Sequence, residues 1–126
     1  MHTDLGDGEY VVRQAGVSLQ RGIEAVGGTL FLTTRRLIFE AHRLNVQTGR
    51  TVIPLRAVEG AWKTWTKLFG VIPIVPNSLA VATERGTVYR FIMFERDAWI
   101  RLIRETKQDL KDEEEPDEER YDRPEE

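Results

Sequence analysis

Cysteine is absent from the sequence, which excludes disulfide bonds, thiolate metal sites and thiol nucleophiles. This absence fits the reducing cytoplasm, where we expect the protein to reside. The longest apolar run, residues 71–75, is far too short to span a bilayer. Residues 1–7 are acidic and have no apolar stretch, so we expect no signal peptide there. Any membrane contact should therefore be peripheral.

Residue types that commonly carry catalysis are also scarce. The histidines are His2 and His42, and the serines are Ser18 and Ser78. No spacing of His, Asp and Glu suggests a metal cage, and neither serine lies in a nucleophile-elbow sequence. Gly27-Gly28 lies within a strand-like pattern rather than in a phosphate-binding loop. We therefore expect no enzyme, no cofactor and no metal site.

Charge is divided unevenly along the chain. Residues 112–126 hold ten acidic and two basic side chains, a net charge of −8, and such a tail is expected to be disordered. Residues 1–111 hold 11 acidic and 16 basic side chains, a net charge of +5. A basic body favours an anionic partner, and the acidic tail of the same chain would compete with that partner.

Alternating apolar residues and short polar turns predict a largely β structure. Strand-like segments occupy residues 8–16, 26–33, 36–42, 50–56, 57–67, 78–84 and 87–94. Arg85-Gly86 is the clearest two-residue turn, and residues 17–25 are ambiguous around a turn at Arg21-Gly22. Pro54 cannot donate to a strand ladder, so it predicts an edge or a bulge. The side chains expected inside the last hairpin are those of Leu79, Val81, Tyr89, Phe91 and Met93.

The periodicity then changes to that of a helix. One stripe of a helix is formed by Trp99, Leu102, Ile103, Thr106 and Leu110. This apolar stripe must cover something apolar, which favours a closed or nearly closed sheet with the helix packed against it. The expected domain organisation is a disordered start at residues 1–7, one domain at residues 8–111 and the acidic tail at residues 112–126.

Several segments resemble GRAM domains, a branch of the pleckstrin-homology (PH) superfold, and they occur in the family's order. These segments are Gly8-Glu9, the hairpin block of residues 27–39, Ile53-Pro54-Leu55 with Val58, and Tyr89-Arg90-Phe91 leading to Arg96 and Trp99. The resemblance implies a mainly β, PH-like partly open barrel or sandwich of about seven antiparallel strands, capped by one C-terminal α-helix. It also implies a module that binds lipid headgroups, membranes or protein segments. PH domains that bind phosphoinositides typically carry several basic residues between their first two strands, where this chain has only Arg21 beside Glu24.

Two regions combine charge and apolar character in a way that suits a membrane surface. The guanidinium groups of arginines at the expected hairpin turn can form paired hydrogen bonds with phosphate. Lysines beside a tryptophan and an apolar loop suit the interface between a membrane and water. The candidate lipid- or partner-binding residues are Arg35, Arg36, Lys63, Trp65, Lys67, Phe69 and Ile72. Each group has a simpler explanation: a solvated turn for the arginines, and a loop tucked into the barrel mouth for the apolar residues.

The candidate partners therefore fall into two classes. The first is an anionic membrane lipid, bound by a cytoplasmic protein that associates peripherally with the membrane. The alternative is a protein segment, including a second copy of this chain, captured by the same loop or by an exposed strand. Nucleic acid is disfavoured because most aromatic residues are expected in the core, which leaves Trp62 or Trp65 for base stacking.

Overall fold

The computed structural model describes residues 1–22, 24–43, 49–65 and 77–114. These residues form seven strands, a short 3-10 helix and one α-helix. In chain order the elements are β1 (Val11–Arg21), β2 (Glu24–Thr33), β3 (Arg36–Ala41), β4 (Arg50–Pro54), η1 (Leu55–Ala57), β5 (Val58–Thr64), β6 (Ser78–Thr83), β7 (Val88–Ile92) and α1 (Arg96–Glu114). No helix within the described ranges is long and apolar enough to cross a membrane.

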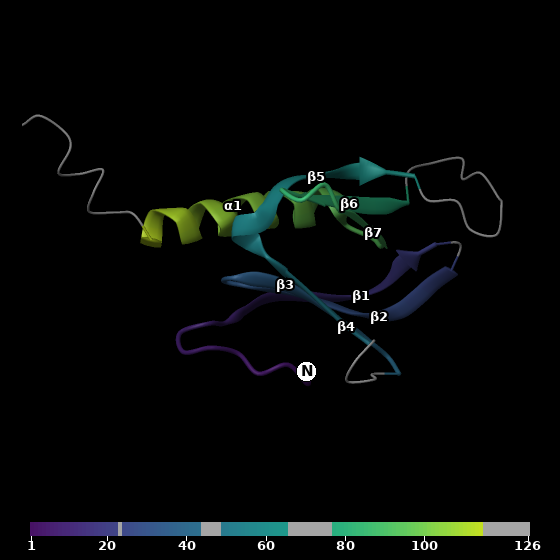
Figure 1. Cartoon of the computed structure of the whole chain (residues 1–126), viewed down its shortest axis with the longest axis horizontal. Coiled ribbons are helices and arrows are strands. Elements are labelled where there is room, and N and C mark those ends of the chain that lie inside the picture. The colour runs from purple at the N-terminus through teal and green to yellow at the C-terminus, as the bar shows by residue number, and fades with distance from the viewer. Residues whose placement is uncertain (23, 44–48, 66–76, 115–126) are drawn as a thin grey trace, which may run out of the picture.

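The strands form one antiparallel sheet in the order β4-β3-β2-β1-β7-β6-β5. The sheet bends where β1 meets β7, because these strands share only the pairs Ser18–Ile92 and Leu19–Phe91. Figure 1 shows the result: β1 to β4 form one layer, β5 to β7 face it, and α1 lies along the second layer. This arrangement confirms the predicted fold of about seven antiparallel strands and one C-terminal helix.

The core lies between the layers and beneath α1. Leu30, Leu37 and Phe91 are among its fully buried side chains. The predicted helix stripe is confirmed, since Trp99 and Ile103 are buried and Leu102 is half-buried against this core. Burial of apolar surface at about 25 cal/mol per Å² is the main force that holds α1 to the sheet.

Residues 1–7, for which the sequence predicts disorder, have no strand or helix but make specific contacts. The carboxylate of Glu40 accepts hydrogen bonds from the backbone of His2 (3.0 Å) and from the backbone and hydroxyl of Thr3 (2.8 and 2.6 Å). Figure 1 shows this segment running along the outer side of the first layer. Phe31 and Ile38 belong to this layer and are buried although neither joins the central core.

Some predicted boundaries were wrong. β1 does not end at Gly16 but continues to Arg21, and the ambiguous residues before the Arg21-Gly22 turn complete it. β4 ends at Pro54, on an edge strand as expected, and the chain then turns through η1 instead of continuing to Arg56. Tyr89 is half-buried rather than inside.

Gly28 is required by the close approach of β2 and β3. A Cβ atom at this position would lie 2.3 Å from the carbonyl oxygen of Glu40 and 2.8 Å from the Cα atom of Ala41. Backbone atoms cannot yield to such a contact without separating the strands. By contrast, a Cβ atom at Gly16 would meet no other atom within 4 Å.

Candidate functional site

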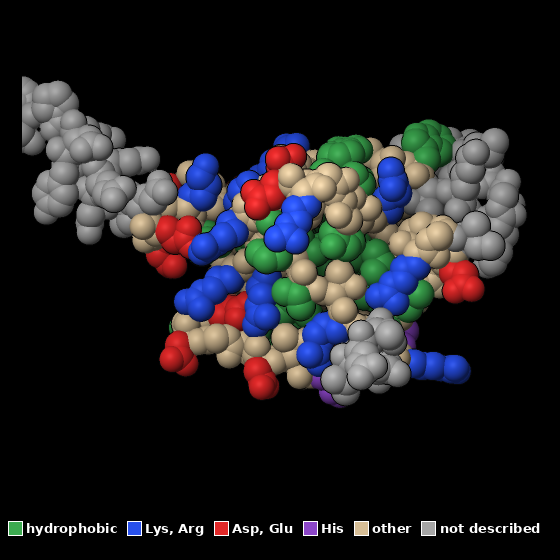
Figure 2. Space-filling model, in the orientation of Figure 1, with side chains coloured by type: hydrophobic (Ala, Val, Ile, Leu, Met, Phe, Trp, Pro, Cys, Tyr) green, Lys and Arg blue, Asp and Glu red, His purple; other side chains and the backbone are tan. Residues whose placement is uncertain are grey.

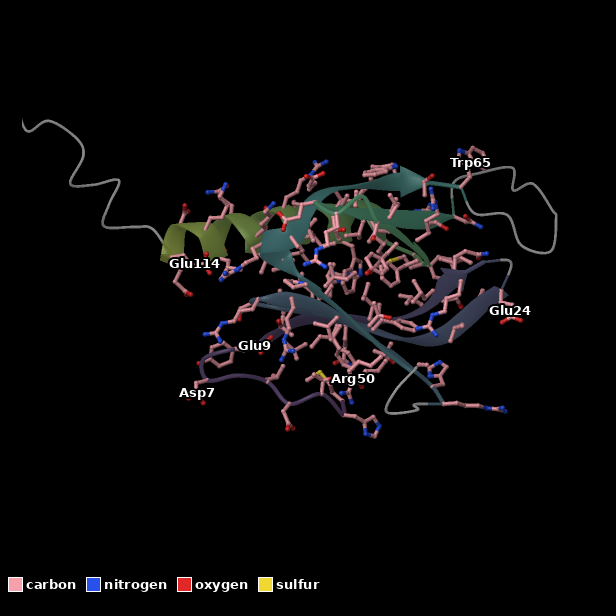
Figure 3. All side chains as sticks on the ribbon, in the orientation of Figure 1. Asp7, Glu9, Glu24, Arg50, Trp65 and Glu114 are labelled. Atoms are coloured by element: carbon pink, nitrogen blue, oxygen red, sulfur yellow. The ribbon has the colours of Figure 1, made fainter. Side chains whose placement is uncertain are left out.

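The two groups of predicted site residues lie at opposite ends of the sheet. Thr64 pairs with Ser78 and Ser78 with Ile92, while Ile92 also pairs with Ser18 and Ser18 with Gly27. We call this row and the strand ends beyond it the loop end. Thr33, at the other end of β2, follows Gly27 by six residues, or about 20 Å of strand, and Arg35 lies in the turn beyond it. Figure 3 shows the separation, with Trp65 and Glu24 at one end and Glu9 and Glu114 at the other.

At the other end, which we call the turn end, Arg36 is committed to an internal ion pair. Its Nε donates to Glu9 at 2.8 Å and its second nitrogen donates to the same carboxylate at 3.0 Å. A third bond runs from Arg36 to the carbonyl oxygen of Asp4 at 2.8 Å. Arg36 thus fastens the N-terminal segment to the β2–β3 turn.

The same ion pair shifts the titration of its carboxyl group. The hydrogen bonds from Arg36 lower the pKa of Glu9 more than desolvation of the buried carboxyl raises it. Thr33 and Gly6 donate further hydrogen bonds to this carboxylate, and together these contacts lower the pKa of Glu9 to about 2. The pKa of Arg36 is raised by the same contact. Both groups are therefore charged at neutral pH, and the carboxylate blocks the guanidinium face that a phosphate would use.

Arg35 differs from its neighbour in exposure. Its guanidinium donates to the carbonyl oxygen of Asp7 at 2.9 Å and remains at the surface. It lines a depression of about 590 Å³ together with Arg36, Arg56 and Glu114. Arg56 forms an ion pair with Glu114, so arginine and glutamate neutralise each other across this depression.

The loop end presents two aromatic side chains to solvent. Trp65, immediately after β5, is 45% exposed, and Phe94, immediately after Met93, is 87% exposed. The two segments are tied through Asn77, which donates to the carbonyl oxygen of Thr64 at 3.1 Å and accepts from the backbone of Met93 at 3.2 Å. Figure 3 shows the Trp65 ring projecting from the end of β5.

The backbone beyond Phe94 holds this side chain outward. Met93 is buried, whereas Glu95 adopts a left-handed conformation with φ of 56°. Such a conformation costs a non-glycine residue on the order of 1 kcal/mol. Glu95 is fixed by its ion pair with Arg13 and by accepting the backbone hydrogen bond of Trp99 at 3.1 Å. The start of α1 therefore fixes the backbone directly after Phe94.

A groove of about 560 Å³ lies beside Phe94 on the surface of the sheet. Its lining is largely apolar and includes Ile92 and Met93, with His42 and Arg96 at its margins. Gly16 and Gly27 are among its lining residues, and a Cβ atom at Gly16 would meet no other atom within 4 Å. The groove and the exposed ring together form a continuous apolar surface at the loop end.

Cations surround this surface without forming a dense patch. Arg21, Arg43 and Lys63 lie at the ends of β1, β3 and β5, and Arg96 begins α1. Lys63 pairs with Asp97 at 3.2 Å, but both side chains are exposed, so this bond is weak. On the face shown in Figure 2, Lys and Arg side chains lie at both ends of the molecule. The distribution of positive charge alone therefore does not identify the loop end as the binding surface.

The outcome for the predicted site residues is mixed. Lys63 and Trp65 lie together at the loop end, whereas Arg35 and Arg36 lie at the turn end. Lys67, Phe69 and Ile72 lie outside the described residues. Phe94 was missed, although the inward alternation of Phe91 and Met93 already implied that it points outward. Within the described ranges, no group of His, Asp and Glu could hold a metal ion.

One route for binding a protein segment is closed by α1. β5 is an edge strand, and an added strand would need its free backbone groups. The side chain of Arg104 donates to the carbonyl oxygen of Ala61 at 3.3 Å, and Lys107 donates to that of Val58. The helix thus occupies two carbonyl acceptors of this edge strand.

Known structures show the same architecture at low sequence identity. The C-terminal domain of an unknown protein from Leishmania infantum is 16% identical, with a TM-score of 0.65, and the match covers 81% of this chain and 87% of that one. The Vps36 N-terminal PH domain is 15% identical, with a TM-score of 0.60 and 84% of each chain covered. The hSac2 domain from the human phosphoinositide phosphatase Sac2 is 12% identical, with a TM-score of 0.62, covering 84% of this chain and 74% of that one.

Sequence comparison supplies the family. No curated protein matches the chain. The family model of the GRAM domain matches residues 1–111, which include every strand and most of α1. With the PH-like neighbours in structure, this match shows that the chain belongs to the GRAM domain family.

Proposed function

We propose that this GRAM domain is a non-catalytic module that attaches peripherally to anionic membranes through its loop end. The observation that carries the proposal is the pair of exposed aromatic side chains, Trp65 and Phe94, at one end of the sheet. Aromatic rings beside cationic side chains suit the boundary between headgroups and acyl chains.

The expected energy is that of a weak and reversible attachment. Burying one aromatic side chain contributes about 1.5–3 kcal/mol, and each cation near an anionic surface contributes about 1 kcal/mol. Two aromatic rings and two cations would supply on the order of 5–8 kcal/mol before the cost of ordering the complex is subtracted. Association should therefore respond strongly to ionic strength.

The proposal assigns roles by position in the fold. We assign headgroup contact to Arg21, Arg43, Lys63 and Arg96, because they lie near the loop end, whereas Arg35 and Arg36 lie at the turn end and Arg36 is bound to the buried carboxylate of Glu9. The segment between β5 and β6 carries Lys67, Phe69 and Ile72. Both flanks of this segment lie at the loop end, so these residues remain part of the proposed membrane-binding region.

Vesicle sedimentation tests the proposal. At low salt we expect binding to vesicles of phosphatidylcholine with phosphatidylserine, and much weaker binding to phosphatidylcholine alone. Phe94→Ala and Trp65→Ala should each lower binding about tenfold, since each removes on the order of 1.4 kcal/mol or more of apolar transfer energy.

Trp62→Ala is the matched control. Trp62 is 44% exposed on β5 and pairs with Ala80, two residues before the Thr64–Ser78 pair that marks the loop end. Its removal should leave vesicle binding unchanged once folding is verified by circular dichroism. Equal binding to both vesicle types, or equal loss from all three substitutions, would contradict the proposal.

A second candidate is a protein-binding module, which the apolar groove beside Phe94 favours. A partner side chain would fit against Gly16, where the groove is open. Gly16→Ala would place a methyl group in the same hollow without a clash, since no atom lies within 4 Å of a Cβ atom there. A variant that loses a protein partner but keeps its vesicle binding would favour this second function.

A further inference from the structure

The acidic tail of the chain starts among the arginines of the turn end. Glu114, the last residue of α1, forms an ion pair with Arg56. Both Glu113 and Glu114 line the depression of about 590 Å³ at this end. These two glutamates belong to the acidic tail, residues 112–126. The described start of the tail therefore already lies against basic side chains.

Positive charge remains available in this depression. The carboxylate of Glu9 is bound to Arg36, and the only other carboxylates among the lining residues come from the tail itself. Arg35 is exposed, and within the described ranges it forms no ion pair. Its one printed contact is the hydrogen bond to the carbonyl oxygen of Asp7. The guanidinium of Arg35 can therefore accept a carboxylate as a further partner.

A second hollow, of about 510 Å³, adjoins the first. The two hollows share Pro54 and Arg56, and the second is also lined by Arg85 in the turn between β6 and β7. Arg85 is exposed, and in the described part of the chain it has no carboxylate partner at ion-pair distance. We call Arg35, Arg56 and Arg85 the arginine group. It extends from the end of α1 across both hollows.

The rest of the tail has the charge and the length to cover these hollows. Residues 115–126 hold seven acidic and two basic side chains, a net charge of −5. Pro116 disfavours a helical conformation at Glu115, so the sequence predicts that the chain leaves the helix axis directly after α1. Fully extended, residues 115–126 would reach about 40 Å. A short tether also gives a local concentration on the order of 1 mM, at which weak exposed ion pairs suffice.

We propose that residues 115–126 dock on the arginine group of the same chain, with tail carboxylates against Arg35 and Arg85. The proposal is independent of membrane attachment, which uses the loop end. It changes the role that the sequence alone predicts for the tail. Docked at the turn end, the tail does not compete with an anionic membrane, because its charge is held away from the loop end.

Paramagnetic relaxation in the full chain tests the proposal. The sequence has no cysteine, so Tyr121→Cys creates one attachment site for a nitroxide label and leaves every charge of the tail in place. At low salt, the label should broaden the backbone amide signals of Arg35 and Arg85, but not those of Arg21 and Phe94 at the loop end. The broadening should be lost at 1 M salt, where the Debye length is about 3 Å. Broadening at the loop end, or at neither end, would overturn the proposal.

A double variant of the labelled chain tests the arginines themselves. Arg35→Gln with Arg85→Gln should abolish the broadening at positions 35 and 85, while the pair between Arg56 and Glu114 is left intact. The matched control is Arg90→Gln with Arg101→Gln, which removes the same charge from exposed positions that line neither hollow. The control should keep the broadening. Equal loss in both variants, or broadening that persists in the first, would refute docking on these arginines.

A variant of the tail gives the same test without changing the folded part. Four carboxylates of the labelled tail are converted to amides: Glu115→Gln, Asp117→Asn, Glu118→Gln and Glu119→Gln. The broadening at positions 35 and 85 should again be lost, since the docking charges are gone. Its persistence would show that the tail lies there for another reason and would rule out the proposed contacts.

A mixing experiment separates docking within one chain from docking between two. Chain labelled with ¹⁵N and lacking the nitroxide is mixed with an equal amount of unlabelled chain that carries it. No broadening is expected, because each tail occupies its own arginine group. Broadening at positions 35 and 85 in the mixture would identify the tail of a second copy as the occupant and overturn docking within the chain.

Discussion

At the residue scale, the ion pair between Glu9 and Arg36 makes the stability of the fold depend on pH. It joins the segment before β1 to the start of β3, two parts of the chain that lie 27 residues apart. Because the pKa of the folded carboxyl is about 2, against an ordinary 4.5, its contribution to stability is complete above pH 4.5. That contribution is lost as the pH falls toward 2.

We therefore expect Glu9→Gln to lower the free energy of unfolding at pH 7 and to flatten its dependence on acid. A shift of this size corresponds to at most about 3 kcal/mol. Urea denaturation at pH 7, 4 and 2.5 measures the difference. The stabilities of variant and parent should converge as the pH falls. A constant gap across this range would show that the charge of the carboxylate is not what stabilises the turn end.

At the element scale, α1 does more than cover the core. Arg104 and Lys107 hydrogen-bond the edge of β5, so the helix closes an edge that would otherwise be free to pair. Buried apolar side chains such as Trp99 and Ile103 hold the helix, and its basic side seals the edge.

The double substitution Arg104→Ala with Lys107→Ala should destabilise the protein by about 1–2 kcal/mol, since two carbonyl oxygens lose their donors. Hydrogen exchange of the β5 amides should also become faster, because the edge is no longer sealed. The matched control is Arg101→Ala with Lys111→Ala, which removes two exposed cations of the same helix. Equal effects of the two double variants would mean that only helix charge matters.

At the scale of the whole molecule, local patterns predicted the elements better than their contacts. The β2–β3 hairpin, the Arg85-Gly86 turn and the Trp99 stripe follow from alternation, turn chemistry and helical period. The predicted first strand is too short because glycine is typical of strand ends. In the structure Gly16 lies within β1, and it lines a groove on the surface.

Long-range pairings had no local signal. Nothing near Arg36 in the sequence shows that Glu9 will neutralise it, and nothing near Glu40 shows that it will bind His2 and Thr3. The candidate site was predicted in part for the same reason. Lys63 and Trp65 are close in sequence and lie together at the loop end, whereas Arg35 was included in the predicted site only because of its charge.

The orientation of the protein on a membrane is tested most directly by tryptophan quenching with brominated lipids. The described tryptophans are Trp62 and Trp65, which are exposed, and Trp99, which is buried. With anionic vesicles at low salt, we expect strong quenching in Trp62→Phe, which retains Trp65, and little in Trp65→Phe, which retains Trp62. Equal quenching of the two variants, or stronger quenching of Trp65→Phe, would contradict attachment through the loop end.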